Sequence, residues 1–236
     1  MRKATLVALG AVVCAVAGYG GTASIVASFR SPCSVAYGID YYDGYLYHAG
    51  LGTPSQIYKT DRFGSIKEIL PNPDATGIDR TPTHFWVCAR SRIYLLETNG
   101  EIVRYFNGPG SVPRGIAYGG GFLWHSNGYY VYKLRTADGA IINSFGAPAP
   151  CAAVAGVFWE AGQLWLAGWA CNLIFKTTET GSVIESFSLG SIKRPYGITR
   201  EGEYVWITAE EYVYKMKISP TAVEPASLGK VKALWR

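Results

Sequence analysis

The sequence of 236 residues lacks the short motifs that mark the common catalytic sites. It has no Gly-x-Ser-x-Gly elbow, no His-Glu-x-x-His pair and no phosphate-binding glycine loop. Histidine is scarce, with three residues, and no long amphipathic segment follows the first twenty positions. The sequence therefore gives no support for an enzyme that uses an activated nucleophile, and we predict no catalytic residue. It also argues against a helical fold.

Charged residues are also scarce, at 17% of the chain. The 22 basic residues exceed the 17 acidic ones by only five, and they form no cluster of the kind that nucleic-acid-binding proteins present. We therefore expect no nucleic-acid partner. Cys-x-x-Cys spacing and clustered histidines are absent as well, so we predict no metal site and no cofactor.

Glycine and aromatic residues are plentiful, and they recur in five copies of one pattern. Every copy begins with a glycine that Ile or Val follows, and an aromatic residue stands nine positions later. The glycines are Gly38, Gly77, Gly115, Gly156 and Gly197. The aromatic residues are Tyr47, Trp86, Trp124, Trp165 and Trp206. Repeats of about 40 residues that hold several short strands are typical of β-propeller blades.

Repeat 3 shows the strand pattern most clearly. Four runs rich in β-branched and aromatic residues begin at Arg114, Phe122, Tyr129 and Ala140, and glycine-containing turns separate them. The opening glycines indicate crowding at a hub where five innermost strands converge. We expect the aromatic residues of the second strands to pack between neighbouring repeats.

The outermost strand is missing from repeat 5 and reappears near the N-terminus. Repeats 3 and 4 contain the related runs Gly139–Phe145 and Gly181–Phe187, whereas repeat 5 reaches Pro220 without such a run. The segment Ala23–Phe29 resembles these outer-strand runs in sequence. We therefore expect it to supply the outer strand of repeat 5, which closes the ring and removes an open sheet edge. The prediction is an all-β, monomeric five-bladed β-propeller over residues 24–219, with four-stranded blades. A larger ring assembled from several chains is the alternative.

The first residues have the character of an export signal. Arg2 and Lys3 precede an apolar stretch that is too short for a transmembrane helix of about 20 residues. Small residues favour cleavage after Ala17 or after Ala23. We therefore expect residues 1–17 to be a signal peptide and the mature protein to be secreted, periplasmic or located at the cell surface, without a transmembrane segment.

Four cysteines lie beyond the expected signal peptide, and an even number in an exported chain favours disulfide bonds. Cys151 stands five residues before the glycine of repeat 4, and Cys171 follows the second strand of that repeat. Because the two innermost strands are antiparallel, these two loops lie on one face. We therefore predict a Cys151–Cys171 disulfide, which leaves Cys33 to pair with Cys88. A metal site formed by the same cysteines is the alternative.

The face of a propeller that carries the loops into the innermost strands usually holds its binding site. There, the residues just before the hub glycines meet the turns that follow the second strands. From these positions we predict a ligand-binding set: Tyr37, His48, Arg114, His125, Trp169, Tyr196 and Glu210. The alternative is that these are ordinary loop residues. Trp169 is the strongest candidate, because no other repeat has a tryptophan at this place.

Asp40 and Asp79 stand two residues after the hub glycines of repeats 1 and 2. Two carboxylates near a channel would suit a Ca²⁺ ion or a shared proton. The alternative is that each accepts a hydrogen bond from the backbone of a neighbouring strand or from water. Because hard cations usually take more oxygen ligands than two aspartates provide, we favour the alternative.

The repeats resemble those of known propeller families over nearly all of the mature chain. The runs Pro113–Tyr118 and Asp138–Phe145 resemble the blades of exported NHL-like and YncE-like propellers. The five-blade count and the segments Leu46–Gly52 and Leu164–Trp169 are similar to those of plant-type and bacterial glutaminyl cyclases, also called glutamine cyclotransferases. In that resemblance Trp169 matches a tryptophan of the family.

The resemblance to the glutaminyl cyclases fails at the residues that bear most on chemistry. His48 stands where the family has a glutamate, and Tyr37 stands where it has a glutamine. Cyclisation of an N-terminal glutamine needs acid–base help at the amine and at the leaving amide. The resemblance therefore implies the propeller architecture. The chain lacks the glutamate that the cyclisation activity of the family would require at position 48.

Three functions from different classes follow from the residues. The first is an exported module that binds a small molecule, a glycan, a peptide or a protein on the loop face. The second is a divergent glutaminyl-peptide cyclotransferase, or a lyase with His48 or His125 as its base. The third is a structural cell-surface protein, for which the basic, apolar tail 220–236 would be a sorting or docking signal; the tail is otherwise a strand packed on the propeller.

Overall fold

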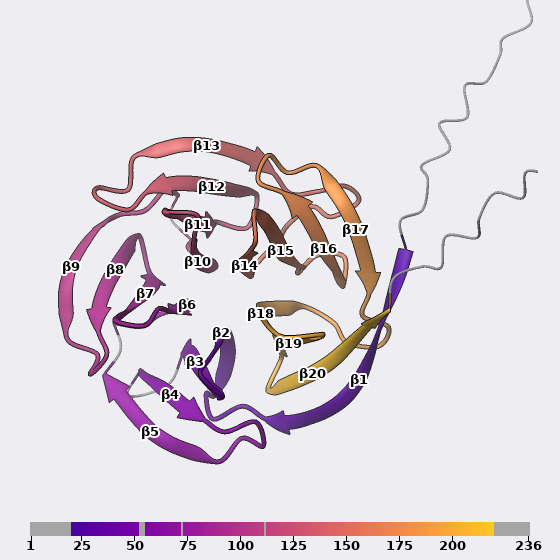
Figure 1. Cartoon of the computed structure of the whole chain (residues 1–236), viewed down its shortest axis with the longest axis horizontal. Coiled ribbons are helices and arrows are strands. Elements are labelled where there is room, and N and C mark those ends of the chain that lie inside the picture. The colour runs from indigo at the N-terminus through magenta and orange to yellow at the C-terminus, as the bar shows by residue number, and fades with distance from the viewer. Residues whose placement is uncertain (1–19, 52–54, 72, 111, 220–236) are drawn as a thin grey trace, which may run out of the picture.

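Within the part of the chain that the structure describes, every regular element is a β-strand. The computed structural model describes residues 20–51, 55–71, 73–110 and 112–219. The expected signal peptide and the C-terminal tail lie outside these residues. Over the described ranges no helix is long and apolar enough to cross a membrane. The sheets are arranged as a ring around a central axis (Figure 1).

Repeats 1 to 3 each form a separate four-stranded antiparallel sheet. Repeat 1 contains β2 (Val35–Tyr42), β3 (Tyr45–Leu51), β4 (Gln56–Thr60) and β5 (Ile66–Pro71). Repeat 2 contains β6 (Gly77–Arg80), β7 (His84–Ala89), β8 (Arg92–Glu97) and β9 (Ile102–Asn107). Repeat 3 contains β10 (Gly115–Gly119), β11 (Phe122–Ser126), β12 (Tyr130–Arg135) and β13 (Ile141–Gly146). The four runs expected in each repeat are confirmed here.

Repeats 4 and 5 share one sheet of eight strands with the N-terminal segment. Repeat 4 contains β14 (Val157–Glu160), β15 (Gln163–Gly168), β16 (Leu173–Thr178) and β17 (Val183–Ser188). Repeat 5 contains β18 (Pro195–Glu201), β19 (Tyr204–Ala209) and β20 (Tyr212–Ser219). The N-terminal strand β1 (Gly20–Arg30) lies between β17 and β20 and joins the two repeats.

Strand β1 pairs with both neighbours in different ways. It is antiparallel to β20 from Thr22, opposite Ser219, to Arg30, opposite Tyr212. This is the pairing that the missing outer strand of repeat 5 predicts. Its first residues also run parallel to β17, with Gly20 opposite Ser186. This short parallel contact is the reason that repeats 4 and 5 form a continuous sheet.

The hub glycines lie within van der Waals contact of the next repeat. A Cβ atom on Gly38 would lie 2.9 Å from the Cα of Gly77, and one on Gly115 would lie 2.9 Å from the Cα of Gly156. A Cβ atom on Gly197 would lie 2.5 Å from the carbonyl oxygen of Tyr37, in repeat 1. Because side chains would force these strands apart, the glycines allow the ring to close around a narrow axis.

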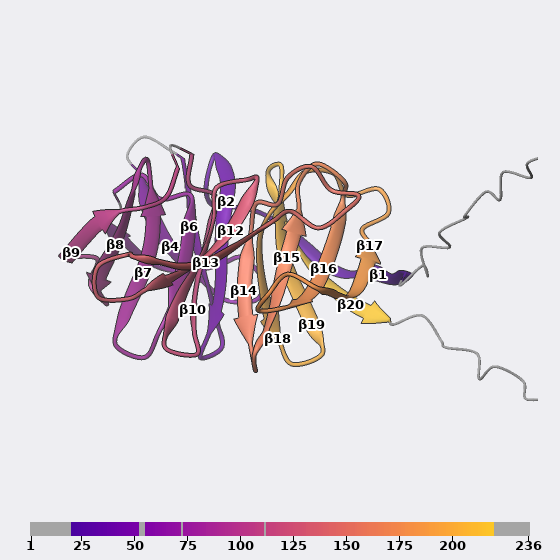
Figure 2. The same cartoon turned by 90° about the horizontal axis from the view of Figure 1, so that it is seen from above.

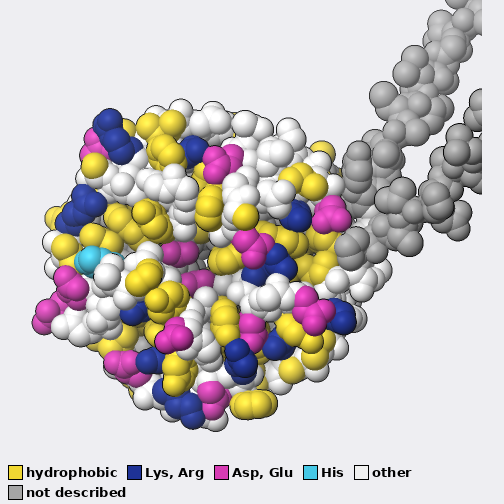
Figure 3. All heavy atoms as spheres, in the orientation of Figure 1, with side chains coloured by type: hydrophobic (Ala, Val, Ile, Leu, Met, Phe, Trp, Pro, Cys, Tyr) yellow, Lys and Arg dark blue, Asp and Glu magenta, His cyan; other side chains and the backbone are white. Residues whose placement is uncertain are grey.

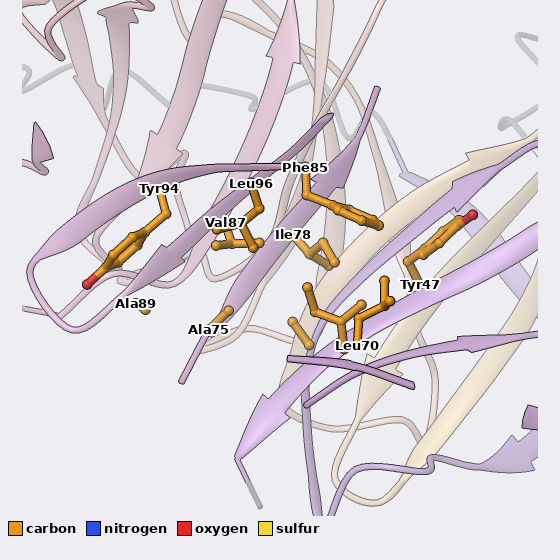
Figure 4. Close-up of a cluster of buried hydrophobic side chains, with 11 residues drawn as sticks. Tyr47, Leu70, Ala75, Ile78, Phe85, Val87, Ala89, Tyr94 and Leu96 are labelled. Carbon is orange, nitrogen blue, oxygen red and sulfur yellow. The ribbon is translucent and has the colours of Figure 1, made fainter. Parts of the chain in front are cut away.

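The core lies between neighbouring sheets and along the axis. Figure 4 shows one cluster, in which Tyr47 and Ile78 come from adjacent repeats and the ring of Tyr47 lies 5.3 Å from that of Phe85. The aromatic residue of every second strand is at most 5% exposed, as expected for packing between repeats. Along the axis, the apolar residues that follow the hub glycines leave a cavity of about 10 Å³, room for about one water molecule. A binding site is therefore more favourable on a face of the ring than inside it.

The cysteines pair only in part as expected. The Cys151–Cys171 disulfide is present, but Cys33 and Cys88 are free and buried, so the prediction of a Cys33–Cys88 bond is wrong. The two thiols have separate places in the packing. Cys33 fills the space beside Gly50, whereas Cys88 fills that beside Gly77 and belongs to a core cluster with Ile116 of repeat 3.

Candidate functional site

The loops into the innermost strands and the turns after the second strands lie on one face, at the top of Figure 2. Strands β6, β10, β14 and β18 all start at this face, so the residues before the hub glycines are brought together there. Figure 3 shows the opposite face, where basic and acidic side chains alternate and do not gather by sign.

Four of the predicted residues form a contiguous group, which we call the aromatic–arginine cluster: Tyr37, Arg114, Trp169 and Tyr196. The rings of Tyr37 and Tyr196 meet edge to face with centroids 4.8 Å apart, a favourable geometry for aromatic pairs. The ring of Trp169 lies 6.4 Å from that of Tyr196. The guanidinium of Arg114 lies 5.5 Å from the centre of a Trp169 ring, within the range of a cation–π contact.

Local backbone irregularities direct the two tyrosines into the cluster. The register of β2 against β3 shifts between Ala36 and Gly38, so Tyr37 is the extra residue of a β-bulge. The register of β18 against β19 shifts in the same way between Pro195 and Ile198, around Tyr196. Bulges re-aim side chains and are common beside functional sites. The hub glycines bring the two bulges close together.

The disulfide holds the loop that carries Trp169. This residue follows β15, two positions before Cys171, and Cys171 is bonded to Cys151 in the loop leading to β14. The backbone N–H of Ala170 donates a hydrogen bond to the carbonyl oxygen of Ala153 at 3.3 Å. Two links therefore fix the position of Trp169 against the loop between repeats 3 and 4.

The phenol of Tyr37 is affected by its partners in the cluster. Partial burial raises its pKa, the neighbouring Tyr196 raises it further, and the positive charge of Arg114 opposes both. The backbone N–H of Arg114 donates to the carbonyl oxygen of Ser126 at 2.9 Å, which fixes the start of β10. Tyr37 therefore stays a neutral hydrogen-bonding group at physiological pH.

A cavity of about 140 Å³ opens beside the cluster. Arg114 and Trp169 form part of its wall, together with Val112, Asn127, Gly128, Tyr129, Ala153, Val154 and Ala155. The side chain of Tyr129 is 69% exposed at its rim. The indole N–H of Trp169 is enclosed, and no acceptor for it exists among the described residues. The walls are therefore mostly apolar, with a cation at one side.

The two predicted histidines lie in the interior and not on this face. The Nε2 of His48 lies 2.8 Å from the hydroxyl of Thr60, and its Nδ1 has no partner among the described residues. The Nδ1 of His125 lies 3.0 Å from the carbonyl oxygen of Gly115. Burial lowers the pKa of His48 to about 3 and that of His125 to about 4. Both rings are thus neutral side chains of the core at physiological pH.

Glu210, the last residue of the predicted set, is exposed in the turn between β19 and β20. It has a φ of 55°, which the tight turn requires. Burial raises the pKa of Tyr214, and the charge of Glu210 raises it further. Glu210 therefore interacts with Tyr214 of β20, whereas three residues of the cluster lie just before the hub glycines.

Asp40 and Asp79 join the innermost strands of neighbouring repeats. Asp40 accepts hydrogen bonds from the backbone N–H of Arg80 and from the hydroxyl of Thr199, both at 2.8 Å. Asp79 accepts one from the backbone N–H of Tyr118. The alternative of bonding to a neighbouring strand is therefore the arrangement observed. In the part of the chain that the structure describes, no three His, Cys, Asp or Glu side chains gather as metal ligands would.

The pKa values of the two aspartates are raised. Burial raises the pKa of Asp40 to about 6, although its hydrogen bonds act in the opposite direction. Burial, followed by the negative charge of Asp40, raises the pKa of Asp79 well above the usual range of a carboxyl group. The two groups are thus close enough to oppose each other's ionisation.

Comparison with known proteins shows the fold. A Myxococcus xanthus glutaminyl cyclase has 11% identity and a TM-score of 0.71, with 86% of this chain and 99% of that chain covered. A streptogramin B lyase has 17% identity and a TM-score of 0.55, with 84% and 98% covered. A Staphylococcus aureus virginiamycin B lyase, solved as a catalytically inactive variant with quinupristin, has 23% identity and a TM-score of 0.52, with 80% and 68% covered.

Sequence comparisons give no further assignment. No protein-family model matches the chain, and no curated protein matches it. The WD40 β-propeller domain of Doa1 has 13% identity and a TM-score of 0.53, with 76% of this chain and 62% of that chain covered. At identities below 25%, the similar structures support a β-propeller architecture and a likeness to the glutaminyl cyclase fold. The activities of these proteins are not assigned to this chain, because one propeller scaffold supports many different functions.

Proposed function

We propose that the chain is an exported five-bladed β-propeller that binds a ligand at the aromatic–arginine cluster. The blade count follows from dividing the eight-stranded sheet into two blades of four strands. One is β14–β17, and the other is β18–β20 with β1 as its outer strand. The return of the hub contacts from Gly197 to Tyr37 of repeat 1 supports a ring of five.

The observation that carries the binding proposal is the convergence of four loop residues from different repeats. Tyr37, Arg114, Trp169 and Tyr196 come from repeats 1, 3, 4 and 5, and they meet next to a cavity. Aromatic residues and arginine are the types that contribute most to recognition. Their position over the hub, on bulges and on a disulfide-fixed loop, presents them as a preformed surface.

Export is supported by the disulfide, because such bonds persist in oxidising compartments. Of the two cleavage positions, Ala17 is the better one. Cleavage after Ala23 would remove the residues of β1 that pair with β17, from Gly20 to Thr22, whereas cleavage after Ala17 leaves the strand whole. The mature chain would then begin just before its first strand.

Binding accounts for the site better than catalysis does. A lyase or cyclotransferase that uses His48 or His125 as a base would need a side chain that reaches the ligand. Both rings are 1% exposed, and burial lowers the pKa of each. A purely structural surface protein would not need Tyr37, Trp169 and Tyr196 to be grouped on the face of the ring.

A thermal-shift screen of the mature protein tests the proposal. The panel contains peptides, oligosaccharides and small carboxylic acids, including peptides that begin with glutamine. A ligand at 100 times its dissociation constant stabilises a protein by about 2.7 kcal/mol, which raises Tm by several degrees. We expect Trp169→Ala to remove the shift. Tyr118→Ala is the matched control, because this exposed aromatic residue lies beside a groove with His84, on the opposite face.

Two outcomes would count against the proposal. A ligand that shifts the Trp169→Ala variant as much as the wild type binds elsewhere. If no member of the panel raises the Tm of the folded wild-type protein, a structural role for the ring is favoured. Turnover of a glutamine peptide that survives Trp169→Ala would favour the enzymatic alternative at another site.

A further inference from the structure

Arg114 is a half-buried arginine for which the described residues provide no anionic partner. Arg80, Arg92, Arg104 and Arg194 form no ion pair there either, but Arg80 and Arg104 donate to carbonyl oxygens, and Arg92 and Arg194 are exposed. Arg90 forms an ion pair with Asp74 at 2.7 Å, and Arg200 forms one with Glu160. For the guanidinium of Arg114, the described residues provide neither a carboxylate nor a carbonyl acceptor; it lies against the face of Trp169, and its charge acts on the phenol of Tyr37. The cluster thus contains a cation without an anionic partner among the residues that the structure describes.

The location of the Arg114 guanidinium makes the lack of an anionic partner energetically unfavourable. The side chain of Arg114 is partly buried between the axis and the cavity, and it lines both. A partly buried charge without a partner is unfavourable, because its lost hydration is not replaced. The planar guanidinium offers parallel N–H donors that match a carboxylate. An incoming anion would therefore find a donor set that is partly shielded from water and lies against an aromatic face.

The rest of the cavity defines what must accompany the anion. Its floor consists of small or compact apolar residues, among them Ala153, Val154 and Ala155. The volume of about 140 Å³ lies well below the 300–1,000 Å³ typical of pockets for whole ligands. Such a space fits one small apolar group and leaves the remainder of a ligand outside.

We propose that the cavity binds an α-carboxylate next to a compact aliphatic side chain, as at the C-terminus of a peptide that ends in valine or alanine. The carboxylate pairs with the guanidinium of Arg114, the aliphatic group fills the cavity against Ala153, and the preceding residues run past Tyr129. A free amino acid offers the same carboxylate and side chain without the preceding residues. This inference rests on the proposed function, because it names the ligand class of the same site.

Calorimetric titration with matched ligands tests the inference. The probes are N-acetyl-Gly-Gly-Val with a free C-terminus, the same peptide as its C-terminal amide, and N-acetylvaline. We expect the acid to bind at least tenfold more tightly than the amide, because a charge-assisted pair is lost with the amide. A tighter complex with the tripeptide than with N-acetylvaline identifies a peptide terminus as the ligand, and equal affinities identify a small carboxylic acid.

Three variants assign the effect to the cavity. Arg114→Gln should weaken binding of the acid roughly 10- to 100-fold and leave the amide unchanged, so that the preference disappears. Arg114→Lys should restore part of the preference, because it keeps the charge without the planar fork. Ala153→Leu should exclude both peptides by filling the cavity, with Arg114 intact. Arg90→Gln, an equal change of charge at an ion pair outside the cavity, should leave binding unchanged.

The inference and the proposed function fail in different ways. Equal affinity for acid and amide, with both lost in Trp169→Ala, would overturn the carboxylate inference and leave the binding face in place. A preference for the acid that persists in Arg114→Gln would also overturn it. No binding of any probe to the folded wild-type protein overturns the inference, and the broader thermal-shift panel then decides on the proposed function separately.

Discussion

The carboxylate of Asp40 accepts the backbone N–H of Arg80 across the junction between repeats 1 and 2. Thr199, at the equivalent place in repeat 5, accepts the backbone N–H of Tyr41 in repeat 1 at 3.1 Å. Asp79 does the same for Tyr118 in repeat 3. Three successive junctions of the ring are therefore fastened by one side chain each, placed two residues after a hub glycine. Repeats 3 and 4 have Ala117 and Phe158 at this place, and other side chains link those junctions. Ser126 donates a hydrogen bond to the carbonyl oxygen of Ala155, and Arg200 forms an ion pair with Glu160.

Replacing Asp79 by Asn should stabilise the protein at neutral and alkaline pH. A carboxyl group whose pKa is higher in the folded than in the unfolded state stabilises the fold only while it is protonated. For Asp79 and Asp40 this contribution is complete below about pH 4. It is lost as the pH rises through about 6 for Asp40, and at a higher pH for Asp79. Asparagine keeps an oxygen acceptor for Tyr118 without the charge.

Unfolding by urea between pH 4 and pH 8 measures this effect. We expect the Asp79→Asn variant to exceed the wild type in unfolding free energy at pH 8, by on the order of 1–3 kcal/mol, and to lose less stability between pH 4 and pH 8. Asp43→Asn, at an exposed turn where asparagine is equally suited, is the control and should change neither quantity. A less stable Asp79→Asn variant at pH 8 would contradict the expectation.

A double substitution in repeat 1 should make the protein more resistant to acid. Burial lowers the pKa of His48 to about 3, so its contribution is complete above the unfolded pKa near 6.5 and is lost as the pH falls toward 3. Repeat 2 has Val87 and Leu96 where repeat 1 has His48 and Thr60. The variant His48→Val/Thr60→Leu therefore introduces a pair that already packs at these positions, and it removes the unpartnered Nδ1.

Thermal unfolding from pH 7 to pH 4 tests this expectation. The double variant should lose less in Tm than the wild type does over this range, while His84→Gln, a change at a half-buried histidine of the opposite face, should behave as the wild type. The aspartates act in the opposite direction between pH 4 and pH 6, so only the difference between variants is informative. An unchanged acid dependence would show that His48 is not the group responsible.

Alanine at a hub glycine should be far more destabilising than alanine at an outer one. A Cβ atom at position 156 would lie 2.9 Å from the backbone nitrogen of Ile198 and closer still to the carbonyl oxygen of Tyr196. Overpacking of this kind costs about 1–3 kcal/mol or more. Gly146, at the end of β13, has no atom within 4 Å of the corresponding point. Equal midpoints for Gly156→Ala and Gly146→Ala in urea would contradict the closeness of the hub.

Loss of the disulfide should lower stability and weaken ligand binding together. For the Cys151→Ser/Cys171→Ser variant we expect a loss of about 2–4 kcal/mol in unfolding free energy, and a lower affinity because Trp169 is no longer held. Peptide mapping without reduction should yield the 151–171 pair. Burial raises the pKa of the Cys33 thiol to about 11 and that of Cys88 to about 12. Both should therefore resist alkylation until the protein unfolds, and rapid labelling of either would contradict their burial.

The register of the repeats predicted the four-stranded antiparallel sheets and the grouping of part of the candidate site. Because each copy places equivalent residues at equivalent points of the ring, Tyr37, Arg114 and Tyr196 could be assigned to one face from the sequence. The Cys151–Cys171 disulfide followed from the same register. In contrast, the Cys33–Cys88 bond was predicted only because these two cysteines remained, and their thiols occupy separate places in the packing.

The two histidines occupy a position of the repeat that is apolar in the other three copies. His48 and His125 stand ten residues after their hub glycines, where the other repeats have Val87, Leu166 and Ile207. Three apolar residues at one point of a repeat indicate a position that faces the core. The hydrogen bonds of Asp40 and the bulges at Tyr37 and Tyr196 depend on distances between repeats, which a single sequence does not encode in a short motif.

The pairing of β1 with β20 has a consequence for biosynthesis. Thr22 lies opposite Ser219, a separation of 197 residues by subtraction. Each of the first four repeats can form its hairpins as soon as it has been made, because the paired strands follow one another in the chain. The first strand must wait for the last one, and bringing together ends so distant in sequence is the slowest kind of contact to form. Folding of a chain made N-terminus first can finish only after β20 has been synthesised, and a truncation before β20 would leave β1 without its antiparallel partner.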